Sequence, residues 1–233
     1  METITKKDNK IVFSMDLDES LANAIRRYVN QVQTIAIDEV DISKNDSPLY
    51  DETLAHRMGL IPLKASTKVN AEGKLKTKKE GFVYSGEIEG IDVVYDKIPL
   101  TLLNKNQEVD IKIRVRKGHG EEHSKFSPGF IFYREASEVE MDKSVLDEVK
   151  SVCPDAEVKE KGGKIVVADN KEKEVCDVCE GICDKEGKEI SIKPTGELII
   201  TVETYGQLKA EDIFKKSIES LKKDLEEVAK KIK

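Results

Sequence analysis

The sequence predicts a chain of mixed helices and β-strands, and three observations support this expectation. Short runs with alternating apolar residues recur between residues 10 and 205, and such runs are typical of strands. A segment near the N-terminus repeats its apolar residues at helical spacing. Residues 209–233 repeat theirs at steps of three and four, which is the spacing of a coiled-coil helix.

The first elements are predicted to be a strand at KIVFSMDL and then a helix over residues 18–30. Five apolar residues share one face of this helix: Leu21, Ala24, Ile25, Tyr28 and Val29. Three polar residues lie off that face: Asn23, Arg26 and Arg27. Solvent-exposed arginine is the simpler interpretation, and an anchor for another protein is the sharper one, because arginine is frequent at interfaces.

The central elements follow in order along the chain. TIAIDEVDI predicts a strand with an irregularity near Asp38–Glu39, and SPLYDETLAHRMG predicts a short helix. Strand-like runs fill residues 82–116, and GFIFYREASEVEM adds another strand or pair of strands. KSVLDEVKSV predicts a short helix. Gly162–Gly163 should turn one hairpin, and a second hairpin should turn near Pro194–Gly196.

The C-terminal helix carries a heptad stripe, called the seam below. Its members are Phe214, Ile218, Leu221, Leu225, Val228 and Ile232. A single helix cannot bury such a stripe by itself, so the seam should meet another part of this chain or a partner.

Composition excludes several classes of protein. The net charge of −7 and a pI near 5.3 disfavour extensive direct contact with DNA. The sequence contains no 18-residue apolar run and no secretory signal at its start, so we expect a cytoplasmic chain with no membrane span. It contains no zinc-protease, P-loop, dinucleotide-binding or nucleophile-elbow motif. Nothing in the sequence reads as a catalytic constellation.

The four cysteines are the strongest chemical signal in the sequence. Cys176, Cys179 and Cys183 fall within VCDVCEGICD, and Cys153 is followed by proline. A remote Cys-Pro, a hairpin and then C-x2-C-x3-C is similar to half of a two-cluster bacterial ferredoxin, although Ile182 occupies the usual third position. This order favours an iron–sulfur cluster over zinc, because only one pair has zinc-knuckle spacing. Unoccupied thiols or a disulfide are the third interpretation.

Three ordered segments then carry a resemblance to a known family. They are FSMDLDESLANAIRRYVNQVQTIAIDEVDI, YDETLAHRMGLIPL and RKGHGEEHSKFSPGFIF. Together they resemble the D-subunit family of archaeal RNA polymerases, which is related to the third-largest subunit of eukaryotic RNA polymerase II and to bacterial alpha. The similarity extends through ISIKPTGELIITVETYG and the C-terminal helix, and therefore spans nearly the whole chain.

The resemblance implies a two-domain α+β fold. Residues 1–42 and 193–233 would form a split, alpha-like dimerisation domain. Residues 43–192 would form an inserted β-rich domain, in which residues 143–192 make a ferredoxin-like subdomain.

The resemblance also implies a function and partners. The chain would be a non-catalytic assembly platform of a DNA-dependent RNA polymerase, which is a nucleotidyltransferase whose active site lies in another subunit. The seam would pair with the smaller L subunit in a heterodimer. Asn23, Arg26 and Arg27 would face the second-largest subunit, and the small N and P subunits would be further neighbours.

The resemblance implies a cofactor as well. Cys153, Cys176, Cys179 and Cys183 would hold a [3Fe-4S] or [4Fe-4S] cluster that stabilises the insert, with zinc the weaker candidate. The alternative function is an iron–sulfur protein for electron transfer or redox sensing.

Overall fold

The computed structural model describes residues 2–154, 157–168 and 176–232. The chain divides into two compact units, Met1–Asn23 with Ile131–Thr201 and Ala24–Phe130 with Val202–Lys233. This division follows compactness and does not test the domain boundaries expected from the sequence, which stay predictions. Among the described residues, no helix combines the length and the apolar character that crossing a membrane requires.

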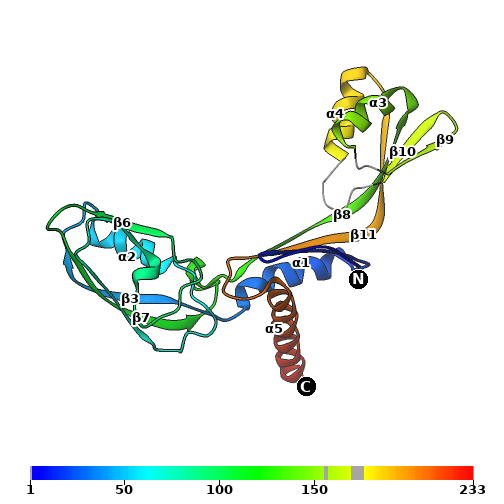
Figure 1. The fold of residues 1–233 in the computed structure, drawn as a ribbon. Helices are drawn as coiled ribbons and strands as arrows, with labels where there is room; N and C mark the ends of the chain where they lie inside the picture. The colour runs from blue at the N-terminus through cyan, green and yellow to red at the C-terminus, as the bar shows by residue number, and fades with distance from the viewer. Residues whose placement is uncertain (1, 155–156, 169–175, 233) are drawn as a thin grey trace. The chain divides into compact units, whose positions relative to one another are not determined.

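The first unit is built on a six-stranded sheet with the order β1-β2-β11-β8-β10-β9 (Figure 1). Its strands are β1 (Glu2–Lys7), β2 (Lys10–Met15), β8 (Gly129–Asp142), β9 (Val158–Lys161), β10 (Lys164–Ala168) and β11 (Ile190–Thr204). Its helical segments are η4 (Lys143–Val145), α3 (Leu146–Val152) and α4 (Cys176–Glu186). The predicted hairpin is confirmed, because β9 and β10 pair antiparallel on either side of Gly162–Gly163.

The second unit contains a three-stranded sheet with the order β3-β7-β4 and a two-stranded sheet of β5 and β6 (Figure 1). Its strands are β3 (Thr34–Asn45), β4 (Glu72–Thr77), β5 (Gly81–Tyr84), β6 (Pro99–Leu103) and β7 (Val109–Gly118). Its helical segments are η1 (Tyr28–Gln31), α2 (Asp51–Gly59), η2 (Ser85–Glu87), η3 (Ser124–Phe126) and α5 (Ala210–Lys231). The remaining helix, α1 (Glu19–Arg27), crosses the boundary between the units.

The core of the second unit lies between its sheets and α2. Alternate residues of β7 are buried, as the period of a strand requires, and they belong to the same buried cluster as Leu54 and Met58 of α2. Strand β7 is the central strand, since Ile111 lies opposite Ile42 of β3 and opposite Leu75 of β4. Ile111 therefore has a paired strand on each side, and its side chain is fully buried in the core.

Two expectations about local structure are corrected. The helix over residues 18–30 buries Ala22, Ile25 and Val29, whereas Leu21 is exposed, so the buried stripe is rotated from the predicted one. The segment ISIKPTGELIITVET is one continuous strand, β11, and not a hairpin. The reason is that β11 lies between β2 and β8, and a reversal at Pro194–Gly196 would break its pairing with one of these two strands. Gly196 has a φ of +79°, which glycine adopts without strain inside the strand.

We predict that Ile111→Ala lowers the free energy of unfolding by about 2–5 kcal/mol, because it leaves a cavity at the centre of the sheet. Ile111→Val is the matched control, for which a loss of about 0.5–1.5 kcal/mol is expected. Urea unfolding followed by circular dichroism measures both. Equal losses for the two variants would contradict the packing described for β7.

Candidate functional site: an exposed seam, a cysteine core and a charged loop

The seam residues lie on α5 and at the residue that follows it. The side chains of Ile218, Leu225, Val228 and Ile232 are 39%, 60%, 53% and 81% exposed. The residues that α5 buries in its own unit are on a different stripe: Ala210, Ile213 and Ser217. An exposed apolar row of this length on a regular helix is typical of a surface that another polypeptide covers. Its role in dimerisation is not tested by the isolated chain.

The three polar residues expected at an assembly interface are exposed on α1. Asn23, Arg26 and Arg27 all lie at the surface, while Ile25 of the same helix is buried. The structure therefore leaves these three side chains accessible, and their partner stays a prediction.

The four cysteines lie in one apolar cluster of the first unit, called the cysteine core below. Cys179 and Cys183 are fully buried there beside Val149 of α3 and Ile165 of β10, and Cys153 and Cys176 pack against the cluster. Cys176, Cys179 and Cys183 share one face of α4, since they are spaced at i, i+3 and i+7. Cys153 is the residue that ends α3, and α3 contacts α4. The helix around the three cysteines was not expected from the sequence.

The electrostatics of the cysteine core argue against a reactive thiol. Burial, and then repulsion from Cys153, Cys176 and Cys183, raises the pKa of Cys179 to about 12. Burial likewise raises the pKa of Cys183. Nucleophilic and redox-active cysteines need a lowered pKa, because the thiolate is the reacting species. No disulfide joins the four cysteines, all of which the structure describes.

The fit of a metal depends on how the thiols are spaced. Among residues 2–154, 157–168 and 176–232, no three His, Cys, Asp or Glu side chains are close enough together to hold a metal ion. Cys176 and Cys183 are separated by about 10.5 Å of helical rise. Two sulfurs on one zinc ion are at most about 4.6 Å apart. The thiols of α4 therefore fit a single zinc ion or one compact cluster poorly while that helix persists, although soft thiolates are the ligand type that both groups take.

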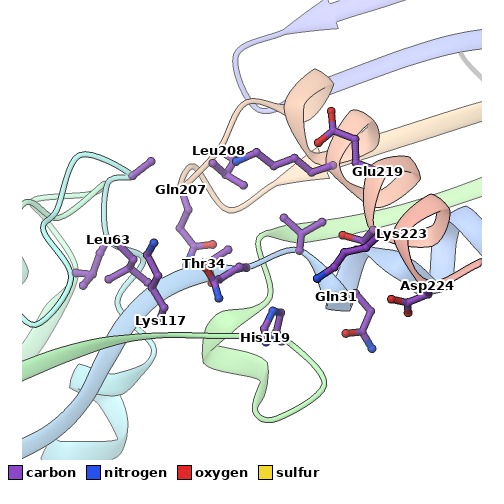
Figure 2. Close-up of a pocket in the computed structure, with 16 residues that line it drawn as sticks. Gln31, Thr34, Leu63, Lys117, His119, Gln207, Leu208, Glu219, Lys223 and Asp224 are labelled. Atoms are coloured by element: carbon purple, nitrogen blue, oxygen red, sulfur yellow. The ribbon is translucent and has the colours of Figure 1, made fainter. Parts of the chain in front are cut away.

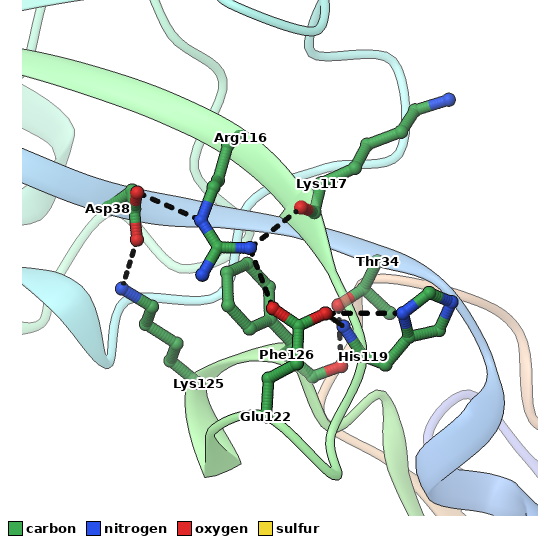
Figure 3. A network of polar contacts seen from close by, with 8 residues as sticks. All are labelled: Thr34, Asp38, Arg116, Lys117, His119, Glu122, Lys125 and Phe126. Atoms are coloured by element: carbon green, nitrogen blue, oxygen red, sulfur yellow. Dashed lines mark hydrogen bonds and ion pairs between the residues drawn. The ribbon is translucent and has the colours of Figure 1, made fainter.

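A charged network fastens the loop after β7 to strand β3 (Figure 3). The β3–β7 ladder shifts register between Ile37 and Glu39, which confirms the predicted irregularity and leaves Asp38 as the extra residue. Asp38 Oδ2 lies 2.8 Å from Arg116 Nε, and Asp38 Oδ1 lies 2.8 Å from Lys125 Nζ. The bulge thus directs one carboxylate at two cations from β7 and η3.

The other side of Arg116 binds the loop itself. Its guanidinium donates to Glu122 Oε2 at 2.9 Å and lies 4.6 Å from the centre of the Phe126 ring (Figure 3). His119 contributes its backbone N–H and its Nδ1 to the same carboxylate, at 3.1 and 3.2 Å. Gly118 is required beneath the ring, because a Cβ there would lie 2.7 Å from Phe126.

The cations of the network hold its carboxylates in their charged form. The hydrogen bond from Lys125 holds the pKa of Asp38 below its ordinary value of 3.8, and Arg116 does the same for Glu122. Carboxylates stabilised in their charged form are poor proton donors near neutral pH. The sequence does not predict this network, because its members are distant along the chain; the expected irregularity at Asp38–Glu39 is the one signal that points to it.

Comparisons with known proteins decide the family. A family model described as the RNA polymerase Rpb3/Rpb11 dimerisation domain matches residues 12–225. The chain belongs to the Rpb3/Rpb11 dimerisation family. The match includes α1, the cysteine core and most of the seam.

Curated relatives of the Rpb3/Rpb11 family agree over nearly the full length. The chain is 32% identical to the DNA-directed RNA polymerase subunit Rpo3 of Pyrococcus furiosus, over 91% of this chain and 89% of the relative. The Rpo3 subunit of Thermococcus kodakarensis is 31% identical over 90% and 88%. That of Pyrococcus horikoshii is 30% identical over 92% and 90%. The family expected from the sequence is therefore confirmed: this is an alpha-like, Rpo3-like chain of the RNA polymerase family.

We predict that Asp38→Asn lowers the free energy of unfolding by about 1–2 kcal/mol at pH 7, because two charged hydrogen bonds weaken together. The folded-state pKa of Asp38 is depressed, so this stability is present above pH 3.8 and is lost as the pH falls through the folded pKa. The difference between variant and wild type should therefore shrink in acid. Urea unfolding at pH 7 and pH 3 measures it. Glu39→Gln, which removes only an exposed pair with Arg114, should cost no more than about 0.5 kcal/mol.

Proposed function

We propose that this chain is the assembly platform of a cytoplasmic, archaeal-type RNA polymerase and has no active site of its own. The observation that carries the proposal is the exposed seam of α5, in a chain whose family is defined by a dimerisation domain. The paired carboxylates of the charged network and the raised pKa of Cys179 support a non-catalytic role. The chemistry of RNA synthesis belongs to other subunits, and this chain supplies their arrangement.

The seam is proposed to pair with the smaller L-type subunit. Leu225, Val228 and Ile232 are more than half exposed, and a matching helix would bury them as a two-helix coil does. Arg26 and Arg27 on α1, with Asn23, are proposed to contact the second-largest subunit. The small N and P subunits are proposed as further neighbours, and we expect little direct contact with DNA because the net charge is −7.

The cysteine core is proposed to hold an iron–sulfur cluster, [3Fe-4S] or [4Fe-4S], with Cys153, Cys176, Cys179 and Cys183 as ligands. The support is that all four thiols lie in one apolar cluster and that three share one face of α4. Crowded thiols with raised pKa values lose their protons only when a cation compensates the charge, so a metal would remove the repulsion around Cys179. The cluster would act as a staple, because a segment of about 50 residues has a marginal core by itself.

We predict that Leu225→Glu with Val228→Glu weakens pairing with the L-type subunit at least a hundredfold, because the pair would bury two uncompensated charges. Isothermal titration of the purified chain with the L-type subunit measures the affinity. Lys230→Glu, an exposed change on the side of α5 opposite the seam, is the matched control and should leave the affinity unchanged.

Two results would count against the assembly proposal. One is wild-type affinity in the double seam variant with retained helical circular dichroism. The other concerns Arg26→Glu with Arg27→Glu, which should spare pairing with the L-type subunit and weaken recruitment of the second-largest subunit. Unchanged recruitment would remove the arginines from that interface.

We predict that the chain purified without oxygen contains iron and acid-labile sulfide, and that Cys176→Ser with Cys179→Ser loses both. Metal analysis with electron paramagnetic resonance before and after reduction measures this. Cys183→Ser decides between three and four cysteine ligands, since retained iron would identify a three-cysteine site. Zinc without iron in the wild type would overturn the cluster and leave the family assignment intact.

A further inference from the structure

A polar groove of about 620 Å³ lies in the second unit, on the side of α5 away from the seam (Figure 2). Its walls come from η1 and the start of β3, from the end of β7 with the following loop, and from the turn that precedes α5. The residues of α5 that line it include Lys216, Glu219 and Lys223. At 3.6 residues per turn, this stripe lies about half a turn from the seam. A partner on the seam would therefore leave the groove accessible.

Gln207 projects into this groove with an unpartnered acceptor (Figure 2). Its side chain is only 6% exposed, and its Oε1 has no hydrogen-bond partner among the residues that the structure describes. A buried acceptor without a donor destabilises a fold, so most native structures satisfy it. This acceptor lies just beneath the groove surface, so an N–H or O–H group from another molecule reaches it once a lining side chain moves aside.

The turn that carries Gln207 is rigid. The Thr204 hydroxyl lies 2.6 Å from the Leu208 carbonyl oxygen, and the Gly206 N–H donates to Thr204 Oγ1 at 2.9 Å. Gly206 has a φ of +97°, and a Cβ there would lie 2.5 Å from Val94 Cγ1. These contacts fix the backbone on either side of Gln207, so a donor for its Oε1 has to come from a neighbouring side chain or from another molecule.

The charges of the groove are also incompletely paired. Lys117, Lys216 and Lys223 line it, and none of the ion pairs among the described residues includes any of them. On the acidic side, Glu219 likewise has no such pair, whereas Asp224 accepts a hydrogen bond from Tyr28 at 3.0 Å. Three lysines against two carboxylates, Glu219 and Asp224, leave the groove with an excess of positive charge, which favours an acidic ligand.

We propose that this groove binds an extended, acidic polypeptide segment of another polymerase subunit. A main-chain N–H of the segment donates to Gln207 Oε1, and its carboxylate side chains pair with Lys117, Lys216 and Lys223. A polypeptide meets both requirements within neighbouring residues, whereas a small inorganic anion meets only the second, since its oxygens are repelled by the Gln207 oxygen. The proposal rests on the proposed function, because it places a second partner on α5 beside the one at the seam.

The first test removes the acceptor. Gln207→Leu is compared with Thr101→Val, which removes the other buried side-chain oxygen that has no partner among the described residues. The urea concentration at the midpoint of unfolding should equal or exceed that of the wild type for both variants, since each loses an unsatisfied polar group. The complex of this chain with the L-type subunit is immobilised, and each remaining subunit is titrated by biolayer interferometry. Gln207→Leu should raise the Kd for one subunit roughly fivefold to tenfold, whereas Thr101→Val should leave the Kd for every subunit unchanged.

The outcomes separate the two proposals. If the chain pairs with no polymerase subunit, the proposed function fails. If it pairs and every subunit binds Gln207→Leu with the wild-type Kd, the groove proposal alone fails.

The second test uses the unmodified chain and does not depend on the folding of a variant. Lysine acetylation by an N-hydroxysuccinimide ester is followed by mass spectrometry, in the free chain and in the assembled polymerase. Lys117, Lys216 and Lys223 should react at least tenfold more slowly after assembly, while exposed Lys222 keeps its rate. Unchanged rates at the three lysines would overturn the proposal. Equal protection of the free chain by inorganic phosphate alone would also overturn it, because the occupant would then be a small anion.

Discussion

The pairing of β3 with β7 is the interaction on which the second unit depends. Their ladder runs from Thr34 opposite Gly118 to Asn45 opposite Val109, so it fixes both the exit of η1 and the start of the loop after β7. The same ladder buries alternate residues of β7 in the core and pushes Asp38 out of register toward Arg116. Core, charged network and groove wall are therefore consequences of one strand pair. A slip of one residue would exchange the faces of β7 and disrupt all three.

The surfaces that the structure describes offer groups suited to contact with other proteins. The acidic groups of the charged network are each satisfied by a cation, whereas the described groups without a partner include the apolar row on α5, the three lysines of the groove and the amide oxygen of Gln207. An enzyme would show the reverse, with an unsatisfied nucleophile or base in a cleft. In the cysteine core, burial raises the pKa of Cys179 and of Cys183, which disfavours their reactive thiolate forms.

Periodicity predicted the elements whose pattern is local. The strands around residues 10–15 and 109–118, the Gly162–Gly163 hairpin and the long C-terminal helix were all found where alternation or heptad spacing placed them. Expectations failed where tertiary neighbours decide the outcome. The Pro194–Gly196 signal is a turn by composition, yet β11 continues through it because strands on both sides hold it. Gln207 has no sequence signal, since its exceptional property is the lack of a partner in three dimensions.

The exposed stripe of α5 has a consequence for a cell that makes this chain in excess. Leu225, Val228 and Ile232 present a row of apolar side chains to water on a helix that is otherwise strongly charged. Such a patch is what chaperones and quality-control proteases recognise on incomplete proteins. An orphan copy would thus be marked for removal by the same residues that the proposed partner would bury. The supply of that partner would then limit how many copies persist, so stoichiometry would be set by survival as well as by synthesis.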